Sequence, residues 1–191
     1  HRVRTLSRRL REEVGVQRAL RRAERGELAT RLAELRVFDL LEELRTRFEE
    51  SPVARGKRLV APASGPDLAF VSDRLLVMRV LSNMVTNAFE ATPPGGEVRF
   101  EWRVEDDGGR VVLQVANPGA MAPGAAERVF QRSFSTKAER GRGLGTYSMK
   151  LFGERYLGGE VWFESDEDAG TRFSLALPVG GPTPRPSAAL N

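Results

Sequence analysis

Apolar and polar positions along the chain follow two periods, one typical of strands and one typical of helices. Residues 98–104 alternate strictly between apolar and charged side chains, which predicts a strand with one buried face and one solvated face. The turn DDGG and the segment VVLQVAN follow, so we expect an antiparallel hairpin there. VWFES and TRFSLALP, joined by DEDAG, predict a second hairpin near the end of the chain.

Helical spacing predicts a helix from Leu40 (LLEELRTRFEES), a longer one from about Asp73 to Ala91, and a third that ends near Tyr156. Asp73 is suited to the N-terminus of its helix, because the helix dipole favours a negative charge there. The core stripe expected on the long helix is Val77, Val80, Leu81, Met84, Ala88 and Ala91.

Short strands are expected near the end of ELATRLAELRVF and in KRLVAP and DLAFVS. Helices interspersed with antiparallel hairpins predict an α/β (α+β) fold. We expect a two-layer sandwich in which helices cover one face of a mostly antiparallel mixed sheet and water covers most of the other.

The two ends of the chain differ in composition from the body between them. Residues 1–26 carry apolar positions at helical spacing, which predicts an amphipathic helical arm. Residues 27–179 contain the periodic elements and are expected to form one domain. The Pro-, Gly- and Ser-rich residues 180–191 predict a disordered tail.

The positive charge of the chain is concentrated in the arm. Residues 1–25 hold nine arginines and three glutamates, a local charge of +6, so the net charge of +4 leaves about −2 for the rest. The arm interleaves glutamates and lacks the stacking aromatics of a single-strand binder, so we expect a solvated helix face and no nucleic-acid partner. The chain has no cysteine, which fits a cytoplasmic location, and no apolar run approaches the ~20 residues of a membrane helix.

Two asparagines interrupt the long predicted helix. Asn83, Asn87 and Glu90 lie on one flank of its core stripe, although asparagine is a poor residue inside a helix. An amide oxygen there is a neutral ligand for a hard cation, and magnesium is commonly held by one or two protein oxygens together with nucleotide phosphates. The alternative is a polar rim that solvates the helix.

A second group of candidate residues lies in VFQRSFSTKAERGRGLGTYSMK, within a weakly periodic span from about Ala116 to Gly145 that predicts a lid. Glycines that open a helix let backbone amides approach a phosphate, and the helix N-terminus adds a partial positive charge. Lys137 is one of three lysines in an arginine-rich chain, which favours a specific use of its ammonium group.

These motifs together resemble the ATPase superfamily that joins DNA gyrase, heat-shock chaperones, sensor histidine kinases and mismatch-repair proteins. NMVTNAFEA resembles its N box, VFQRSFSTK the histidine-kinase F box, GRGLGTYSMK the second glycine box, and GTRF the closing strand. The four motifs stand in the family's order over about residues 35–178. The resemblance implies the Bergerat ATP-binding fold of the GHKL superfamily and, in particular, the catalytic domain of a sensor histidine kinase.

The resemblance also implies roles for individual residues. Asn87, assisted by Asn83, would hold Mg2+ on the triphosphate of ATP, and Lys137 and Arg142 would neutralise charge. Superfamily members with a carboxylate base place Glu where this chain has Asn83. The nucleotide-binding residues expected are Asn83, Asn87, Glu90, Asn117, Gly119, Met121, Phe130, Thr136, Lys137, Gly141, Arg142, Gly143, Leu144, Gly145 and Thr171, and the catalytic ones Asn87, Lys137 and Arg142.

Two positions depart from the family pattern. The first glycine box has Asp where this chain has Asn117, and Gly where it has Met121. A neutral acceptor is weaker than a charged one by about 1 kcal/mol, so adenine binding is expected to be roughly fivefold weaker. The single histidine, His1, is followed by Arg2 and does not fit the phosphoacceptor motif of a histidine followed by an acidic residue.

We therefore expect a kinase domain that transfers the γ-phosphoryl group to a histidine on a helix outside this sequence. Residues 1–26 resemble the second helix of a dimerisation hairpin. The expected partners are a response regulator receiver domain and a second copy of the protein, joined through the helical arm. The alternatives are a serine kinase of the anti-sigma type on the same fold and an interaction module that binds no nucleotide.

Overall fold

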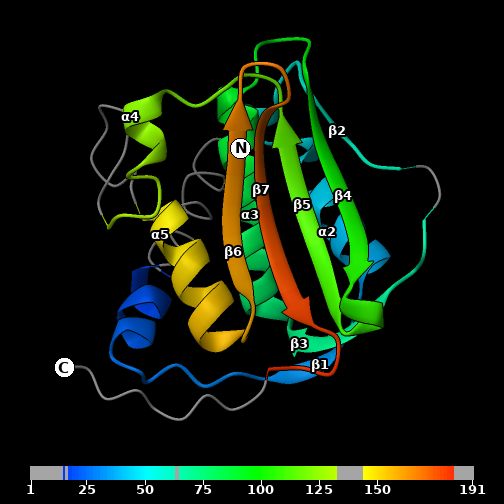
Figure 1. Cartoon of the computed structure of the whole chain (residues 1–191), viewed down its shortest axis with the longest axis vertical. Helices are drawn as coiled ribbons and strands as arrows, with labels where there is room; N and C mark the ends of the chain where they lie inside the picture. The colour runs from blue at the N-terminus through cyan, green and yellow to red at the C-terminus, as the bar shows by residue number, and fades with distance from the viewer. Residues whose placement is uncertain (1–14, 16, 63–64, 133–143, 183–191) are drawn as a thin grey trace. The chain divides into compact units, whose positions relative to one another are not determined.

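The computed structural model describes residues 15, 17–62, 65–132 and 144–182 (Figure 1). The chain forms two compact units, His1–Thr30 and Arg31–Asn191. Residues 17–24 of the first unit are helical, and its role as part of a dimerisation hairpin stays a prediction. The expected disordered tail lies almost entirely outside the described residues.

The second unit contains a five-stranded sheet in the order β2-β4-β5-β7-β6. Its strands are Arg58–Val60 (β2), Glu97–Glu105 (β4), Arg110–Asn117 (β5), Gly170–Pro178 (β7) and Glu160–Asp166 (β6). β2 and β4 are parallel and the other three pairs are antiparallel, so the expected mixed sheet is confirmed. Both predicted hairpins are present, β4 with β5 and β6 with β7.

A smaller antiparallel pair joins β1 (Leu32–Arg36) to β3 (Ala69–Asp73), where two short strands were expected. The backbone N–H of Val71 donates to the carbonyl of Val179 at 2.9 Å, which links β3 to the residue after β7. The small pair is thus attached to one end of the large sheet, below it in Figure 1.

The helices of the second unit are α2 (Val37–Glu49), α3 (Arg74–Ala91), α4 (Pro123–Ala126) and α5 (Gly145–Lys150), which continues as a π-helix over Leu151–Tyr156. Single turns lie at Pro52–Ala54 and Asp106–Gly108. α2 and α3 lie behind the sheet in Figure 1. The π-helix packs on the same face, because a Cβ on Gly153 would lie 2.4 Å from Val161 and 3.1 Å from Leu175, which face α3 by strand alternation.

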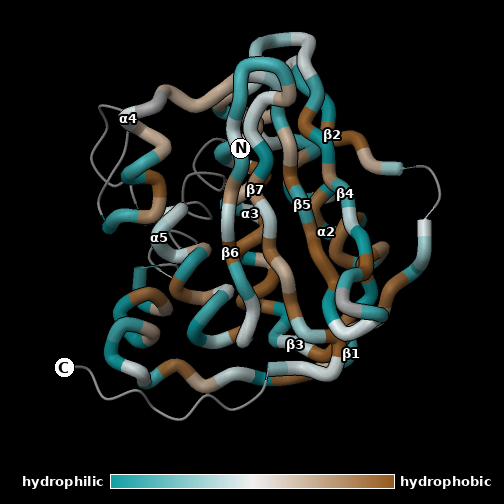
Figure 2. Tube along the Cα trace, in the orientation of Figure 1, coloured by the Kyte–Doolittle hydropathy of each residue, from teal (hydrophilic) through white to brown (hydrophobic). Residues whose placement is uncertain are grey.

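Helix α3 forms the centre of the helical layer, and Figure 2 shows apolar residues along it and along β5. Its N-terminus is capped as expected, because the carboxylate of Asp73 accepts a hydrogen bond from the backbone N–H of Leu76 at 3.0 Å. The stripe from Val77 to Ala88 is buried, but Ala91 is exposed because the helix ends there. Leu76, Met78, Val85 and Phe89 are buried as well, so α3 buries more than one stripe.

The opposite face of the sheet is less open to water than the alternation predicts. Gln114 and Ser174 lie on that face, yet they are 6% and 0% exposed. A guanidinium N–H of Arg103 donates to the side-chain oxygen of Gln114, whose amide N–H donates to the Ser174 hydroxyl at 2.8 Å. The expected burial of β4 also fails at its end, where Val104 is 41% exposed. No helix in the described ranges combines the length and the hydropathy needed to cross a membrane.

Candidate functional site

The side chain of Asn83 connects helix α3 to the start of helix α5. Its amide nitrogen donates to the hydroxyl of Ser148 at 3.0 Å and to the carbonyl of Gly145 at 3.3 Å. Ser148, which is fully buried, donates to the same carbonyl at 2.8 Å. This triangle fixes the first turn of α5, which has no side-chain cap of its own. The amide oxygen of Asn83 is not used in it.

Asn87 lies one turn further along the same flank of α3 and is half-buried. Within the described residues its amide has no hydrogen-bond partner. A neutral oxygen at the rim of a helix, with no competing bond, fits the oxygen ligands that Mg2+ prefers. Glu90 is half-buried on the same flank. In the part of the chain that is described, no cluster of three or more His, Cys, Asp or Glu could hold a metal ion.

Asn117 is the last residue of β5 and is 5% exposed. Strand alternation places it on the helix-covered face, opposite Thr171 of β7. One N–H of its amide donates to the carbonyl of Pro118 at 2.9 Å, and no partner for its amide oxygen is found among the described residues. Asn117 therefore presents an unused acceptor at this end of the sheet.

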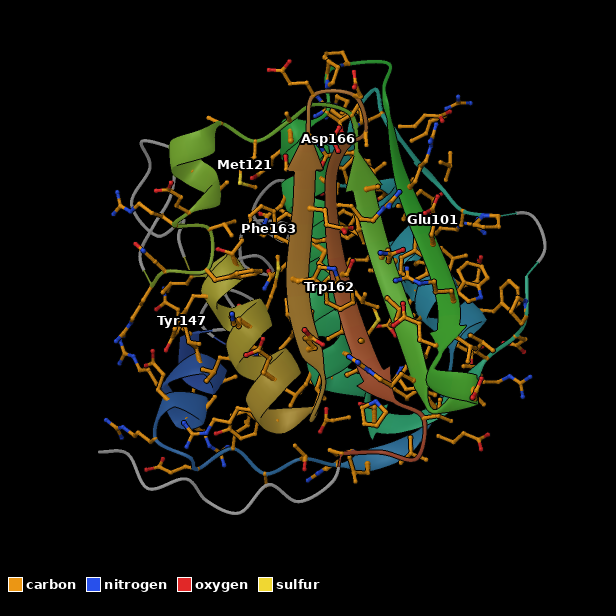
Figure 3. The ribbon with its side chains drawn as sticks, in the orientation of Figure 1. Glu101, Met121, Tyr147, Trp162, Phe163 and Asp166 are labelled. Carbon is orange, nitrogen blue, oxygen red and sulfur yellow. The ribbon has the colours of Figure 1, made fainter. Side chains whose placement is uncertain are left out.

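The segment after Asn117 is tied to the hairpin of β6 and β7. The Thr171 hydroxyl donates to the carbonyl of Gly119 at 2.9 Å and lies 2.8 Å from the Ser165 hydroxyl. The backbone N–H of Met121 donates to the Ser165 hydroxyl at 2.7 Å. Figure 3 marks Met121, Phe163 and Asp166 in this region. Two hydroxyl groups thus hold the residues that the sequence assigned to the first glycine box.

Phe130 lies in an aromatic cluster on the sheet. Its ring centroid is 5.8 Å from that of Phe163 on β6 and 6.3 Å from that of Phe173 on β7, both in edge-on geometry. The ammonium of Lys150 lies 5.1 Å from the Phe130 centroid. The packing anchors the end of the segment between α4 and residue 132. A contact between Phe130 and nucleotide stays a prediction.

The C-terminal ends of α3 and β5 and the start of β7 lie at the same end of the sheet, at the top of Figure 1. The structure brings Asn83 together with Gly145, and Asn117 together with Gly119, Met121 and Thr171. Gly145 is the first residue of α5 and Leu144 precedes it, and both are half-buried. Thr136, Lys137, Gly141, Arg142 and Gly143, and with them residues 133–143 of the predicted lid, lie outside the described residues.

Sequence reasoning did not identify Ser148 or Ser165 as members of this site. Ser148 lies in the GRGLGTYSMK segment, three residues after Gly145, where its sequence position is that of an ordinary helix residue. Ser165 is the inward residue at the end of an alternating strand, where a hydroxyl in place of an apolar side chain was the available signal. Both act through contacts with residues distant in sequence.

A family model described as histidine kinase-, DNA gyrase B-, and HSP90-like ATPase matches residues 72–181. The sensor histidine kinase WalK of Bacillus subtilis (strain 168) is 30% identical over 117 residues, which make up 59% of this chain and 19% of WalK. The chain thus corresponds to a small part of that relative.

Solved structures of histidine kinases are similar to this chain. The catalytic domain of histidine kinase ThkA matches with a TM-score of 0.69 and 26% identity, over 79% of this chain and 97% of that domain. Full-length ShkA in complex with AMPPNP matches with a TM-score of 0.68 and 27% identity, over 81% of this chain and 32% of ShkA. ThkA in complex with the response regulator TrrA has a TM-score of 0.65 at 24% identity, over 89% of this chain and 49% of that chain.

Proposed function

Because more than half of its residues match the family model, the chain belongs to the histidine kinase-, DNA gyrase B-, and HSP90-like ATPase family, and we propose that it catalyses ATP-dependent phosphorylation of a histidine. The resemblance stated from the sequence is thereby confirmed. The chain is the ATP-binding kinase domain of a sensor histidine kinase by this family match and by its similarity to the ThkA catalytic domain. The activity, substrates and partners of the whole protein are proposals.

The observation that carries the proposal is the pair of amides on one flank of α3. Asn87 has no hydrogen-bond partner in the described residues, and Asn83 keeps its amide oxygen unused while its nitrogen holds α5. Asn87, with the oxygen of Asn83, would hold magnesium on the triphosphate, where the ion supplies charge neutralisation. An amide does not take up a proton near neutral pH, so neither residue can activate water for hydrolysis.

The reaction is the transfer of the γ-phosphoryl group to an imidazole nitrogen. The nitrogen forms a bond to phosphorus, the bond between the γ-phosphorus and the bridging oxygen breaks, and ADP leaves. Positioning and charge neutralisation supply most of the catalysis in reactions of this type. Asn117 would accept a hydrogen bond from the adenine amino group, and Lys137 and Arg142 would neutralise charge on the phosphates.

The acceptor histidine, a response regulator receiver domain and a second copy of the protein are the proposed partners. The complex of ThkA with TrrA supports the kind of partner. Dimerisation through residues 1–26 and a cytoplasmic location stay predictions from the sequence.

Incubation with γ-labelled ATP tests the activity. The chain itself should acquire no label, because His1 lacks a neighbouring acidic residue. A longer version that includes the preceding helix should acquire acid-labile label on the added segment. Label that survives acid would identify a serine kinase, and the absence of nucleotide binding by calorimetry would identify an interaction module.

A further inference from the structure

Asn117 offers both a hydrogen-bond donor and an acceptor where the family pattern has a carboxylate. We propose that the base pocket accepts guanine as well as adenine, so that the chain binds GTP with an affinity close to that for ATP. The proposal rests on the proposed function, because it takes Asn117 as the residue that faces the base.

Of the described side chains Asn117, Ser165 and Thr171 near the end of β5, only Asn117 keeps a hydrogen-bond donor free for a base. The hydroxyl of Thr171 donates to the Gly119 carbonyl. The hydroxyl of Ser165 accepts from the Met121 N–H and lies 2.8 Å from the oxygen of Thr171, to which it can donate. Both hydroxyl protons are therefore used within the protein. The amide of Asn117 keeps one N–H and its oxygen without a partner among the described residues.

Adenine and guanine present opposite patterns to such a group. Adenine carries an amino donor at C6 and an acceptor at N1, whereas guanine carries a carbonyl acceptor at C6 and a donor at N1. A carboxylate only accepts, so it pairs with the adenine amino group and opposes the guanine carbonyl. An amide pairs with adenine in one orientation and with guanine in the other.

One orientation of the Asn117 amide is favoured in this structure by the bond, 2.9 Å long, from its N–H to the Pro118 carbonyl. Reversing the amide in place would set two oxygens against each other, so binding of guanine requires the side chain to turn away from Pro118 as well. With that turn the loss is one neutral hydrogen bond, which corresponds to a factor of about five in binding. A carboxylate at this position would leave the guanine carbonyl unpaired against a negative charge, and polar mismatches of that kind give discrimination of about a hundredfold or more.

Calorimetric titration of the full chain with magnesium-ATP and magnesium-GTP tests the proposal. The ratio of the two dissociation constants should be below about ten for the wild type and should rise above about a hundred in Asn117→Asp. Gln114→Glu is the matched control, since it makes the same change of amide to carboxylate on the same strand but on the opposite face of the sheet. It should leave the ratio unchanged.

Two results would overturn the inference. One is a wild type that binds ATP but binds GTP more than a hundredfold less tightly, and this result is decisive even if Asn117→Asp folds poorly. The other is an unchanged ratio in a folded Asn117→Asp variant. If the wild type binds neither nucleotide, the proposed function itself fails, and the inference fails with it.

Discussion

The amide nitrogen of Asn83 donates to the hydroxyl of Ser148 at 3.0 Å, across 65 residues of sequence. The bond joins α3, which carries both candidate magnesium ligands, to the first turn of α5. Ser148 is fully buried and is also bonded to the Gly145 carbonyl, so the position of α5 depends on a polar contact inside the helical layer. Asn83 therefore holds α5 through its amide nitrogen in addition to being a candidate ligand, whereas Asn87 makes no such packing contact within the described residues.

Ser148→Ala should destabilise the second unit. The substitution leaves the Asn83 amide with the longer bond to Gly145 alone, and an unmet buried donor costs about 1–2 kcal/mol. Urea unfolding should show a lower midpoint with an unchanged slope. Thr146→Ala, at a half-buried neighbour in the same helix turn, is the control and should change stability by less than about 0.5 kcal/mol. Equal effects of the two variants would mean that the Asn83 contact contributes nothing.

Asn87→Ala should abolish the effect of magnesium on nucleotide binding without lowering the stability of the fold. Because its amide bonds to no described residue and alanine is the better helix former, the variant should be as stable as the wild type or up to about 0.5 kcal/mol more stable. Calorimetry with ADP should show that magnesium no longer strengthens binding. Asn83→Ala should instead lower stability, since it removes the contacts to α5. A magnesium effect that survives in Asn87→Ala would exclude this residue as a ligand.

The sequence was sufficient for the elements whose pattern is local. The alternation in β4, the long apolar period of α3 and the Asp73 cap each depend on neighbours within a few residues, and each was found where expected. The predicted burial of Ala91 and Val104 was wrong. Burial at these positions depends on where the helix or strand ends and on what covers that end.

Contacts between distant residues could not be predicted in the same way. The hydroxyls of Ser148 and Ser165 matter because the fold brings Asn83 and Met121 to them. The π-helix after α5 was also missed, since its sequence carries the same apolar spacing as an α-helix. The motifs predicted the candidate site, whereas the hydrogen bonds around its residues became visible in the structure.

Gly170→Ala should be far more damaging than Gly56→Ala. Both glycines have positive φ, +78° and +71°, so alanine is strained at either position. At Gly170 the new Cβ would lie 2.2 Å from the carbonyl oxygen of Asn117, whereas at Gly56 nothing lies within 4 Å. We expect a loss of about 1 kcal/mol for Gly56→Ala and about 3 kcal/mol or more for Gly170→Ala. Chemical denaturation measures both, and similar losses would show that β5 and β7 can separate at this point.

The contact between Lys150 and Phe130 should be measurable as a coupling energy. The ammonium lies 5.1 Å from the ring centroid and 3.9 Å from a carboxylate oxygen of Glu154. Phe130→Leu keeps apolar volume but removes the ring, and Lys150→Met keeps the stem but removes the charge. A double-mutant cycle of the two should give a coupling of about 0.5–1 kcal/mol, the range for a partly exposed cation over an aromatic face. The pair Lys150→Met and Glu154→Gln is the comparison and should couple more weakly, because it is a partly exposed i,i+4 ion pair. If the coupling energy between Phe130 and Lys150 is zero, the contact between them contributes nothing to stability. The aromatic cluster alone would then hold this segment on the sheet.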